Sequence, residues 1–173
     1  MSEKEQSNLE IRQIKLWEVP KLLAFRAEYD YKVPFLPESS KTDKDSALYH
    51  ILKMLWHRKR MATFVAVRGR EVLGYISFVS GKYKRSQGNA YLVSAAVKKS
   101  ERGQGIGSSL FQAVEEYARA QGSRRIEFDV FSANKRALEL YKRLGYEIEG
   151  VKRRAVENER GSDDLIFMAK FIQ

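Results

Sequence analysis

The sequence contains no cysteine among its 173 residues and only two histidines. Without thiols, the chain forms no disulfide, no cysteine-bound zinc site and no acyl-cysteine intermediate. His50 and His57 stand seven residues apart, which is not the i,i+4 pair that binds a metal on one helix face. We therefore interpret both histidines as structural and expect no metal site.

Long apolar runs are absent as well. None approaches the roughly 18 residues of a membrane-spanning helix, and the segment Met1–Glu10 is charged and polar rather than patterned as a signal peptide. The sequence also shows no internal repeat, low-complexity tract or linker. We therefore expect a cytoplasmic protein with no membrane partner, built as a single domain over residues 1–173.

Basic residues outnumber acidic residues. The chain has 32 Lys and Arg against 22 Asp and Glu, which gives a formal net charge of +10. Such a field favours anionic ligands, whether phosphates, nucleic acid or an acidic protein surface, and does not choose among them. No recognised RNA-reading or DNA-reading motif accompanies the charge, so nucleic acid is not the expected partner.

Hydrophobic periodicity and turn residues predict an alternation of strands and helices. The predicted strands are Leu9–Leu16, Thr63–Val67, Val72–Val79, Tyr91–Val97, Ile126–Val130, Tyr146–Val156 and Leu165–Phe171. Helices are predicted from Pro20 to about Glu28, over Leu48–Trp56, from Ser108 to Gly122 and after Asn134. The polar segments Tyr31–Thr42 and Glu157–Asp164 are predicted loops.

A glycine-rich run, Arg102–Gly107, separates the predicted strand Tyr91–Val97 from the helix that starts at Ser108. Glycines in this setting let the backbone approach a bulky ligand, and the free N–H groups at a helix start favour an anion such as pyrophosphate. The spacing is not that of a dinucleotide loop, because Ser108 or Leu110 stands where G-x-G-x-x-G needs its third glycine. No Lys-Ser or Lys-Thr pair follows, which excludes a G-x-x-x-x-G-K-[ST] loop.

The run resembles instead the R-x-x-G-x-G acyl-CoA loop of the GNAT acetyltransferase superfamily. A second segment fits the same family, since Asn134, Ala137, Tyr141, Gly145 and Tyr146 match its N-x-x-A-x-x-x-Y-x-x-x-G-[FY] pattern. The strong part of the resemblance covers about residues 89–150. It implies an α/β fold of the α+β type, with a mixed, mostly antiparallel central sheet that is flanked by helices and splayed at the acyl-CoA site.

The resemblance implies an N-acetyltransferase that moves an acetyl group directly from acetyl-CoA to a primary amine and releases coenzyme A. The acceptor would be a small molecule, a protein N-terminus or a lysine. In the family, the strand before the loop pairs with the pantetheine arm, the loop amides hold the pyrophosphate, and an asparagine contacts the coenzyme. By position, these cofactor-binding residues are Ala95, Ala96, Val97, Arg102, Gly103, Gln104, Gly105, Ile106, Gly107, Ser108 and Asn134.

Two of the implied site residues have a structural alternative. Tyr141 matches the family's proton donor to the departing thiolate, and its position on one helical face with Ala137 and Leu144 also suits a core tyrosine. Asn134 precedes a predicted helix, so it can cap that helix as well as contact the coenzyme.

The general base is where the sequence departs from many members of the family. They carry a carboxylate on the strand before the glycine loop, and Tyr91–Val97 contains none. Glu127, Asp129 and Glu38 are the remaining candidates, acting directly or through water. This departure leaves one alternative function, a non-catalytic module that binds or senses acyl-CoA. The sequence leaves a homodimer open.

Overall fold

The computed structural model describes residues 9–29, 61–80, 88–158 and 161–173. The described residues form a seven-stranded sheet with the hydrogen-bonded order β1-β2-β3-β4-β5-β7-β6. The fold divides into two compact units, Met1–Val79 with Val93–Val114 and Ser80–Leu92 with Glu115–Gln173. The predicted helix Leu48–Trp56, the loop Tyr31–Thr42 and the candidate base Glu38 lie outside the described residues.

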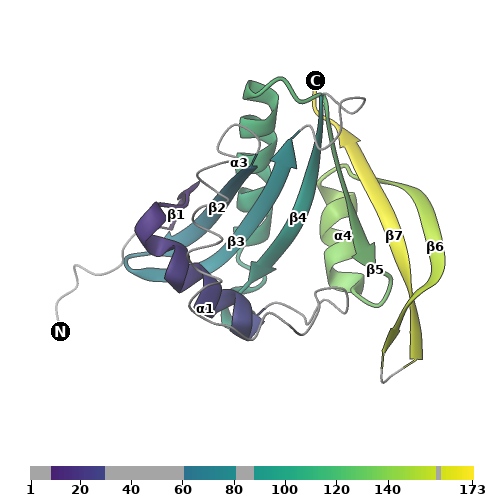
Figure 1. Cartoon of the computed structure of the whole chain (residues 1–173), viewed down its shortest axis with the longest axis horizontal. Helices are drawn as coiled ribbons and strands as arrows, with labels where there is room; N and C mark the ends of the chain where they lie inside the picture. The colour runs from purple at the N-terminus through teal and green to yellow at the C-terminus, as the bar shows by residue number, and fades with distance from the viewer. Residues whose placement is uncertain (1–8, 30–60, 81–87, 159–160) are drawn as a thin grey trace. The chain divides into compact units, whose positions relative to one another are not determined.

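The described part of the first unit contains strands β1 to β3, the end of β4, helix α1 and the start of helix α3 (Figure 1). In chain order its elements are β1 (Glu10–Gln13), the 3-10 turn η1 (Leu16–Glu18), α1 (Val19–Tyr29), β2 (Met61–Arg68), β3 (Glu71–Ser80), the end of β4 (Asn89–Val97), the 3-10 turn η4 (Lys99–Glu101) and the start of α3 (Ile106–Ala120). β1, β2 and β3 pair in antiparallel fashion, and β2 and β3 form a hairpin. Leu22 and Phe25 of α1 pack on Val65, Val67 and Tyr75 of that hairpin.

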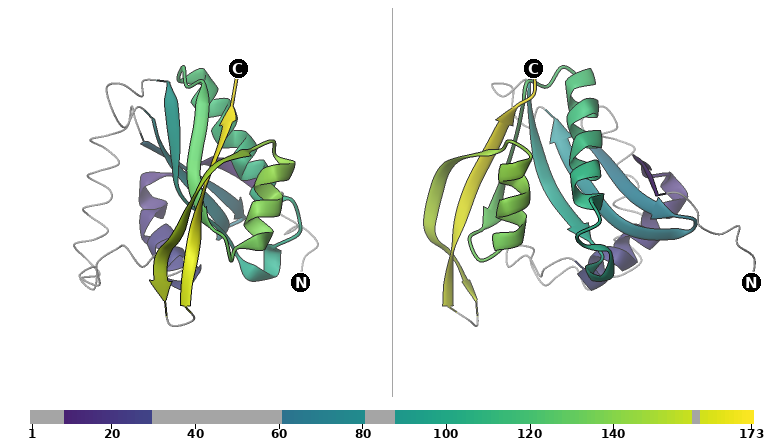
Figure 2. Two further views of the ribbon diagram at one scale, coloured as in Figure 1. Left: turned by 90° about the vertical axis from the view of Figure 1, so that its right-hand side faces the viewer. Right: turned by 180° about the vertical axis from the view of Figure 1, so that it is seen from behind.

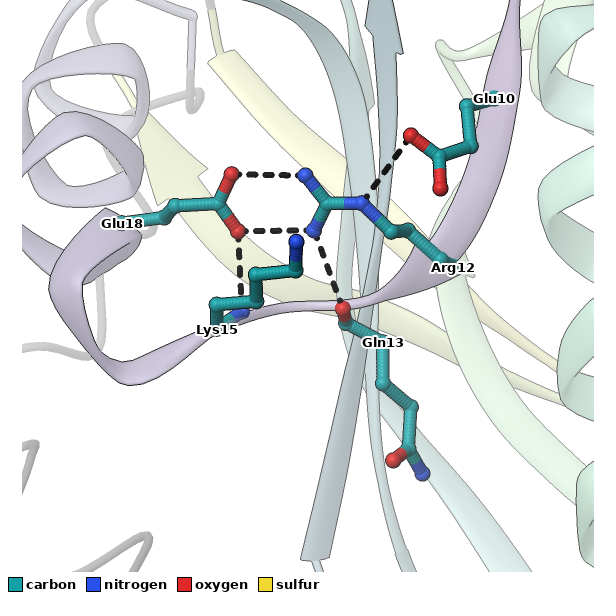
Figure 3. A network of polar contacts seen from close by, with 5 residues as sticks. All are labelled: Glu10, Arg12, Gln13, Lys15 and Glu18. Atoms are coloured by element: carbon teal, nitrogen blue, oxygen red, sulfur yellow. Dashed lines mark hydrogen bonds and ion pairs between the residues drawn. The ribbon is translucent and has the colours of Figure 1, made fainter.

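The first strand is shorter than the predicted Leu9–Leu16 because a polar network turns the chain after Gln13 (Figure 3). The guanidinium of Arg12 donates two hydrogen bonds of 2.8 Å to the carboxylate of Glu18. One oxygen of that carboxylate also accepts the backbone N–H of Lys15 at 2.9 Å. Glu18 thereby ties β1 to the turn that begins α1, and its pKa falls to about 2, mainly through the hydrogen bonds from Arg12.

Gly74 allows β3 to lie unusually close to the end of β4. A Cβ at this position would stand 2.9 Å from the carbonyl oxygen of Ala96 and 3.2 Å from a methyl group of Val97. Nearby, the amide of Lys98 donates to the carbonyl of Leu73 at 2.8 Å. The strand that precedes the glycine run is therefore fixed against β3 by backbone contacts that a side chain would disrupt.

The second unit holds the start of β4, the rest of α3, and a three-stranded antiparallel layer covered by one helix. Its elements are β5 (Arg125–Phe131), α4 (Lys135–Arg143), β6 (Glu147–Asn158) and β7 (Gly161–Phe171). α4 lies along one face of β5 and β7 (Figure 2). On that face the buried side chains include Phe128, Leu138 and Met168.

β4 and β5 run parallel and pair over three residue positions, from Asn89 with Arg125 to Tyr91 with Glu127. The strand pairs β1–β2, β2–β3, β5–β7 and β6–β7 are antiparallel, so the mixed, mostly antiparallel sheet is confirmed. The splay of these strands at the acyl-CoA site stays a prediction.

The prediction of a polar loop over Glu157–Asp164 is wrong. β6 continues to Asn158 and β7 begins at Gly161, with Glu157 opposite Ser162 in the ladder. Polarity does not end these strands because backbone N–H and C=O groups form the ladder, and β6 is an edge strand with no need of an apolar face there.

Candidate active site

The glycine run follows β4 through a short, well-anchored turn. After η4, Gly103 and Gly105 adopt φ values of 92° and 83°, which side-chain-bearing residues rarely adopt. α3 then begins at Ile106, two residues earlier than predicted. The N–H of Ser109 is the first that donates back along the helix, to the carbonyl of Gly105 at 3.0 Å. The amides between Gly103 and Ser108 therefore precede the helical ladder, as an anion site at a helix start requires.

Arg102 contributes to this loop in a different way from the glycines. Its amide donates to the carbonyl of Lys99 at 3.4 Å, so this N–H is already engaged within the turn. Its side-chain Nε donates to the carbonyl of Val97 at 3.0 Å and thus fastens the loop to the end of β4. Two ion pairs add anchors, Arg68 with Glu101 at 3.1 Å and Lys98 with Glu71.

The end of β4 presents small side chains and one hydroxyl. Ala95 is exposed, whereas Ala96 packs partly against the apolar cluster of the first unit. Ser94 shares a hydrogen bond of 2.6 Å with the hydroxyl of the buried Tyr75 on β3. This pair was not predicted from the sequence, because it joins residues 19 positions apart and no sequence motif indicates the contact.

Asn134 caps α4, which is the helix-capping role that the sequence offers as an alternative to a coenzyme contact. Its Oδ1 accepts the N–H of Ala137 at 3.2 Å, and its side chain is exposed. The preceding residues are held by β7, since Asp163 accepts the N–H of Ala133 at 3.2 Å and Ser132 Oγ also donates to it. Because the cap uses the carbonyl end of the Asn134 amide, the contact with a coenzyme would come from its Nδ2 hydrogens.

Tyr141 lies on α4 among aromatic rings of the second unit. Its ring meets Phe128 of β5 edge-on, with 4.6 Å between centroids, and stands 6.5 Å from the ring of Tyr146. Burial raises the pKa of the Tyr141 phenol to about 12. The phenol is therefore protonated throughout the neutral range, which is the form that a proton donor needs.

The carboxylate candidates for the general base have different surroundings. Glu127 accepts a hydrogen bond of 2.7 Å from Arg125 Nε, while the other end of that guanidinium makes a two-pronged contact with Glu149. The hydrogen bonds from Arg125 lower the pKa of Glu149. Asp129 is exposed on β5 opposite Phe167 of β7. A base role for either Glu127 or Asp129 stays a prediction.

The part of the chain that the structure describes contains neither a metal-binding cluster nor a membrane-spanning helix. Within the described ranges, no group of three or more His, Asp or Glu side chains is arranged to hold a metal ion. None of the helices in that part of the chain has the length and apolarity needed to cross a bilayer.

Comparisons with known proteins agree with this arrangement. Residues 24–146 match the model of the acetyltransferase (GNAT) family. An L-methionine sulfoximine/L-methionine sulfone acetyltransferase of Pseudomonas aeruginosa is 40% identical over 82 residues, 46% of either chain. A thialysine N-epsilon-acetyltransferase of Bos taurus is 41% identical over 73 residues, 42% of this chain and 41% of the other. The chain thus spans less than half the length of these curated relatives.

The fold comparison extends over nearly the whole chain. A crystal structure of a GNAT-family acetyltransferase from Streptococcus pneumoniae superposes with a TM-score of 0.80 at 24% identity and covers 96% of this chain and 100% of the other. At that identity the likeness shows the fold alone. The family match covers well over half of the chain, and both motif segments lie within the described fold. The chain therefore belongs to the GNAT acetyltransferase family.

Proposed function

We propose that this protein is an acetyl-CoA-dependent N-acetyltransferase that transfers an acetyl group directly to a primary amine. The observation that carries the proposal is the loop at Gly103–Ser108, where two glycines with left-handed φ lead into the 15-residue helix α3 and the amides precede the helical ladder. Amides and helix dipole together favour a pyrophosphate, which acetyl-CoA supplies. A single catalytic domain over residues 1–173, a cytoplasmic location and a homodimer stay predictions.

The reaction needs no covalent enzyme intermediate. The neutral amine attacks the thioester carbonyl carbon, a C–N bond forms, and the C–S bond breaks as the thiolate leaves. Tyr141 donates a hydrogen bond to the departing sulfur, and the proton lost by the amine reaches the thiolate through solvent. The products are the N-acetyl amine and coenzyme A, so protons and electrons balance.

The acidity of Tyr141 limits what it can contribute. With a pKa of about 12, the phenol is a weaker acid than an ordinary thiol, whose pKa is about 8.5. Complete transfer to a free thiolate is therefore uphill by about 5 kcal/mol, at 1.36 kcal/mol for each pKa unit. The phenol instead stabilises charge on sulfur while the C–S bond breaks, and solvent exchange completes the transfer.

The acceptor class follows from the missing carboxylate and the net charge. At pH 7 a lysine-like amine with a pKa of about 10.4 needs about 4.6 kcal/mol to lose its proton, whereas an α-amino group near 7.8 needs about 1.1 kcal/mol. β4 offers no carboxylate after Tyr91 to assist, and the formal charge of +10 repels polycations. We therefore propose α-amino groups, protein N-termini and other low-pKa amines as better acceptors than free polyamines. Of the relatives named above, one is named for acetylation of L-methionine sulfoximine and L-methionine sulfone, and the other for the N-epsilon amine of thialysine.

Release of free thiol from acetyl-CoA across a panel of amines tests the proposal. The panel contains an acidic peptide with a free N-terminus, a free amino acid, an amino-sugar phosphate and spermidine, at one low salt concentration. We expect turnover with at least one low-pKa amine and a loss of about 100-fold in Tyr141→Phe, the usual size of a general-acid contribution. A clear preference for spermidine would contradict the acceptor assignment.

The second candidate function is a module that binds acyl-CoA without turnover. The observation that favours it is the contact between Glu127 and Arg125, because it occupies one of the remaining carboxylates. Calorimetry separates the two functions. Coenzyme binding without thiol release for any amine would select the binding module, and absence of binding would exclude both.

A further inference from the structure

The C-terminus of α4 folds back on itself in a way that places two tyrosines together. The amide of Gly145 donates to the carbonyl of Lys142 and that of Tyr146 donates to the carbonyl of Tyr141, both at 3.0 Å. This pair of hydrogen bonds is the Schellman motif, with Gly145 at its left-handed position and a φ of 84°. The Y-x-x-x-G-[FY] part of the sequence pattern thus corresponds to one helix cap.

The motif brings the side chains at its two ends into contact. In Schellman caps the residue after the glycine commonly packs on the residue whose carbonyl it binds, which here is Tyr141. The ring of Tyr146 stands at 68° to that of Tyr141, and both rings meet Phe128, at 5.0 Å and 4.6 Å between centroids. The three rings therefore form one cluster, in which Phe128 and Tyr146 both lie next to the Tyr141 ring.

A partly buried ion pair lies close to the ring of Tyr146. Lys170 of β7 donates a 2.7 Å hydrogen bond to Glu115 of α3, and its Nζ lies 5.6 Å from the centre of the Tyr146 ring. Tyr146 is 2% exposed and Glu115 is 9% exposed. Burial and the charge of Glu115 raise the pKa of the Tyr146 hydroxyl, so this ring stays neutral. Tyr146 thus has little freedom to move away from Tyr141.

We propose that Tyr146 is a positioning residue, and that its ring, placed by the cap at Gly145 and held against Lys170, fixes the phenol of Tyr141 for donation to the leaving sulfur. The inference rests on the proposed function of Tyr141. The ring performs this task and the hydroxyl does not, since the contacts to Tyr141 and Phe128 are made through the ring. The pattern's acceptance of either Phe or Tyr at this position follows directly.

A double-mutant cycle separates positioning from general stability. The variants are Tyr146→Leu, which removes the ring, Tyr146→Phe, which keeps it, Tyr141→Phe, and Tyr141→Phe combined with Tyr146→Leu. For each we measure the turnover number with the best acceptor of the panel, the acetyl-CoA affinity by calorimetry, and the melting temperature. A residue that acts through Tyr141 has nothing left to affect once the Tyr141 hydroxyl is gone.

We expect Tyr146→Leu to lower kcat at least tenfold while the coenzyme Kd changes less than threefold. Tyr146→Phe should keep kcat within twofold of the unmodified protein. The kcat of the double variant should lie within twofold of that of Tyr141→Phe. Three results would each overturn the inference. In the first, the kcat loss of the double variant equals the product of the losses in the two single variants. In the others, kcat is unchanged in Tyr146→Leu, or Tyr146→Phe is as slow as Tyr146→Leu. An unchanged kcat in Tyr141→Phe would instead reject the general-acid role itself.

A second variant and a second readout cover the remaining cases. If Tyr146→Leu does not fold, Gly145→Val replaces it in the cycle, with Gly145→Asn as the matched control, because asparagine tolerates the left-handed φ. If no amine supports turnover, fluorine NMR of 3-fluorotyrosine placed at position 141 reports ring position directly. We expect one narrow resonance that Tyr146→Phe retains and Tyr146→Leu shifts or broadens, and an unchanged resonance in Tyr146→Leu refutes the positioning.

Discussion

Replacing Gly105 by valine tests whether the backbone of the glycine loop binds the coenzyme. A Cβ at this position would have no heavy atom within 4 Å, so the protein itself leaves room for a side chain. The cost arises from the φ of 83°, which is strained for any L-residue by about 1–2 kcal/mol and more for a β-branched one. Valine therefore either stores this strain or turns the loop amides away.

The measurable effects follow from that cost. A loss of 1–2 kcal/mol corresponds to about a five- to thirtyfold change in an equilibrium constant, and each charge-assisted hydrogen bond that is lost adds about 1.5–3 kcal/mol. We therefore expect Gly105→Val to bind acetyl-CoA at least tenfold more weakly in calorimetry. Its melting temperature should fall by about 2–4 °C for each kcal/mol of strain.

Gly105→Asn is the matched control, because asparagine enters left-handed conformations more readily than valine. It should melt within about 2 °C of the unmodified protein. Coenzyme affinity in this variant then shows whether the phosphates use the open space beside the Cα atom. A folded Gly105→Val protein with unchanged acetyl-CoA affinity would refute the assignment of this loop to the pyrophosphate.

Three further predictions follow from the described contacts. Because the Tyr141 pKa is about 12 and the protonated phenol is the active form, kcat should not fall between pH 8 and pH 10, and a midpoint near 10 in the pH–rate profile would contradict this. Glu18→Gln should destabilise the protein by about 1–3 kcal/mol at pH 7, and because the folded pKa is lowered to about 2, urea denaturation should show the difference shrinking as pH falls from about 4.5 towards 2. Gly74→Ala should cost about 1–3 kcal/mol in the same assay, since its Cβ meets the Ala96 carbonyl at 2.9 Å, and equal stability would show that β3 and β4 can separate freely.

The sequence was sufficient for features that depend on neighbouring residues. Alternating apolar residues predicted β5, and the left-handed φ of 78° at Gly122 explains why glycine ends α3 there. The glycine loop was predictable as well, because strand, glycines and helix follow one another directly. The polar end of the β6–β7 hairpin was mispredicted because its ladder depends on backbone pairing, which polarity does not report.

Contacts that depend on register between distant strands were beyond sequence reasoning. Arg125 and Glu149 are 24 positions apart, and their contact depends on β7 lying between β5 and β6 in the sheet. Ser94 and Tyr75 meet because β3 and β4 are neighbours. Nothing in the local pattern of either pair specifies a partner. The acidity and hydrogen bonding of a candidate base therefore cannot be read from its position in a motif.

The search for a general base is best considered together with the acceptor. Arg125 engages the Glu127 carboxylate and the hydroxyl of Ser94 is shared with Tyr75, while Asp129 on β5 stays a candidate base. An enzyme with such surroundings gains most from an amine that is already partly neutral at pH 7. An α-amino acceptor lowers the deprotonation cost by about 3.5 kcal/mol relative to lysine, which falls within the range of about 2.7–5.4 kcal/mol that a general base contributes. The absent strand carboxylate and the proposed choice of acceptor are thus two consequences of one chemical requirement.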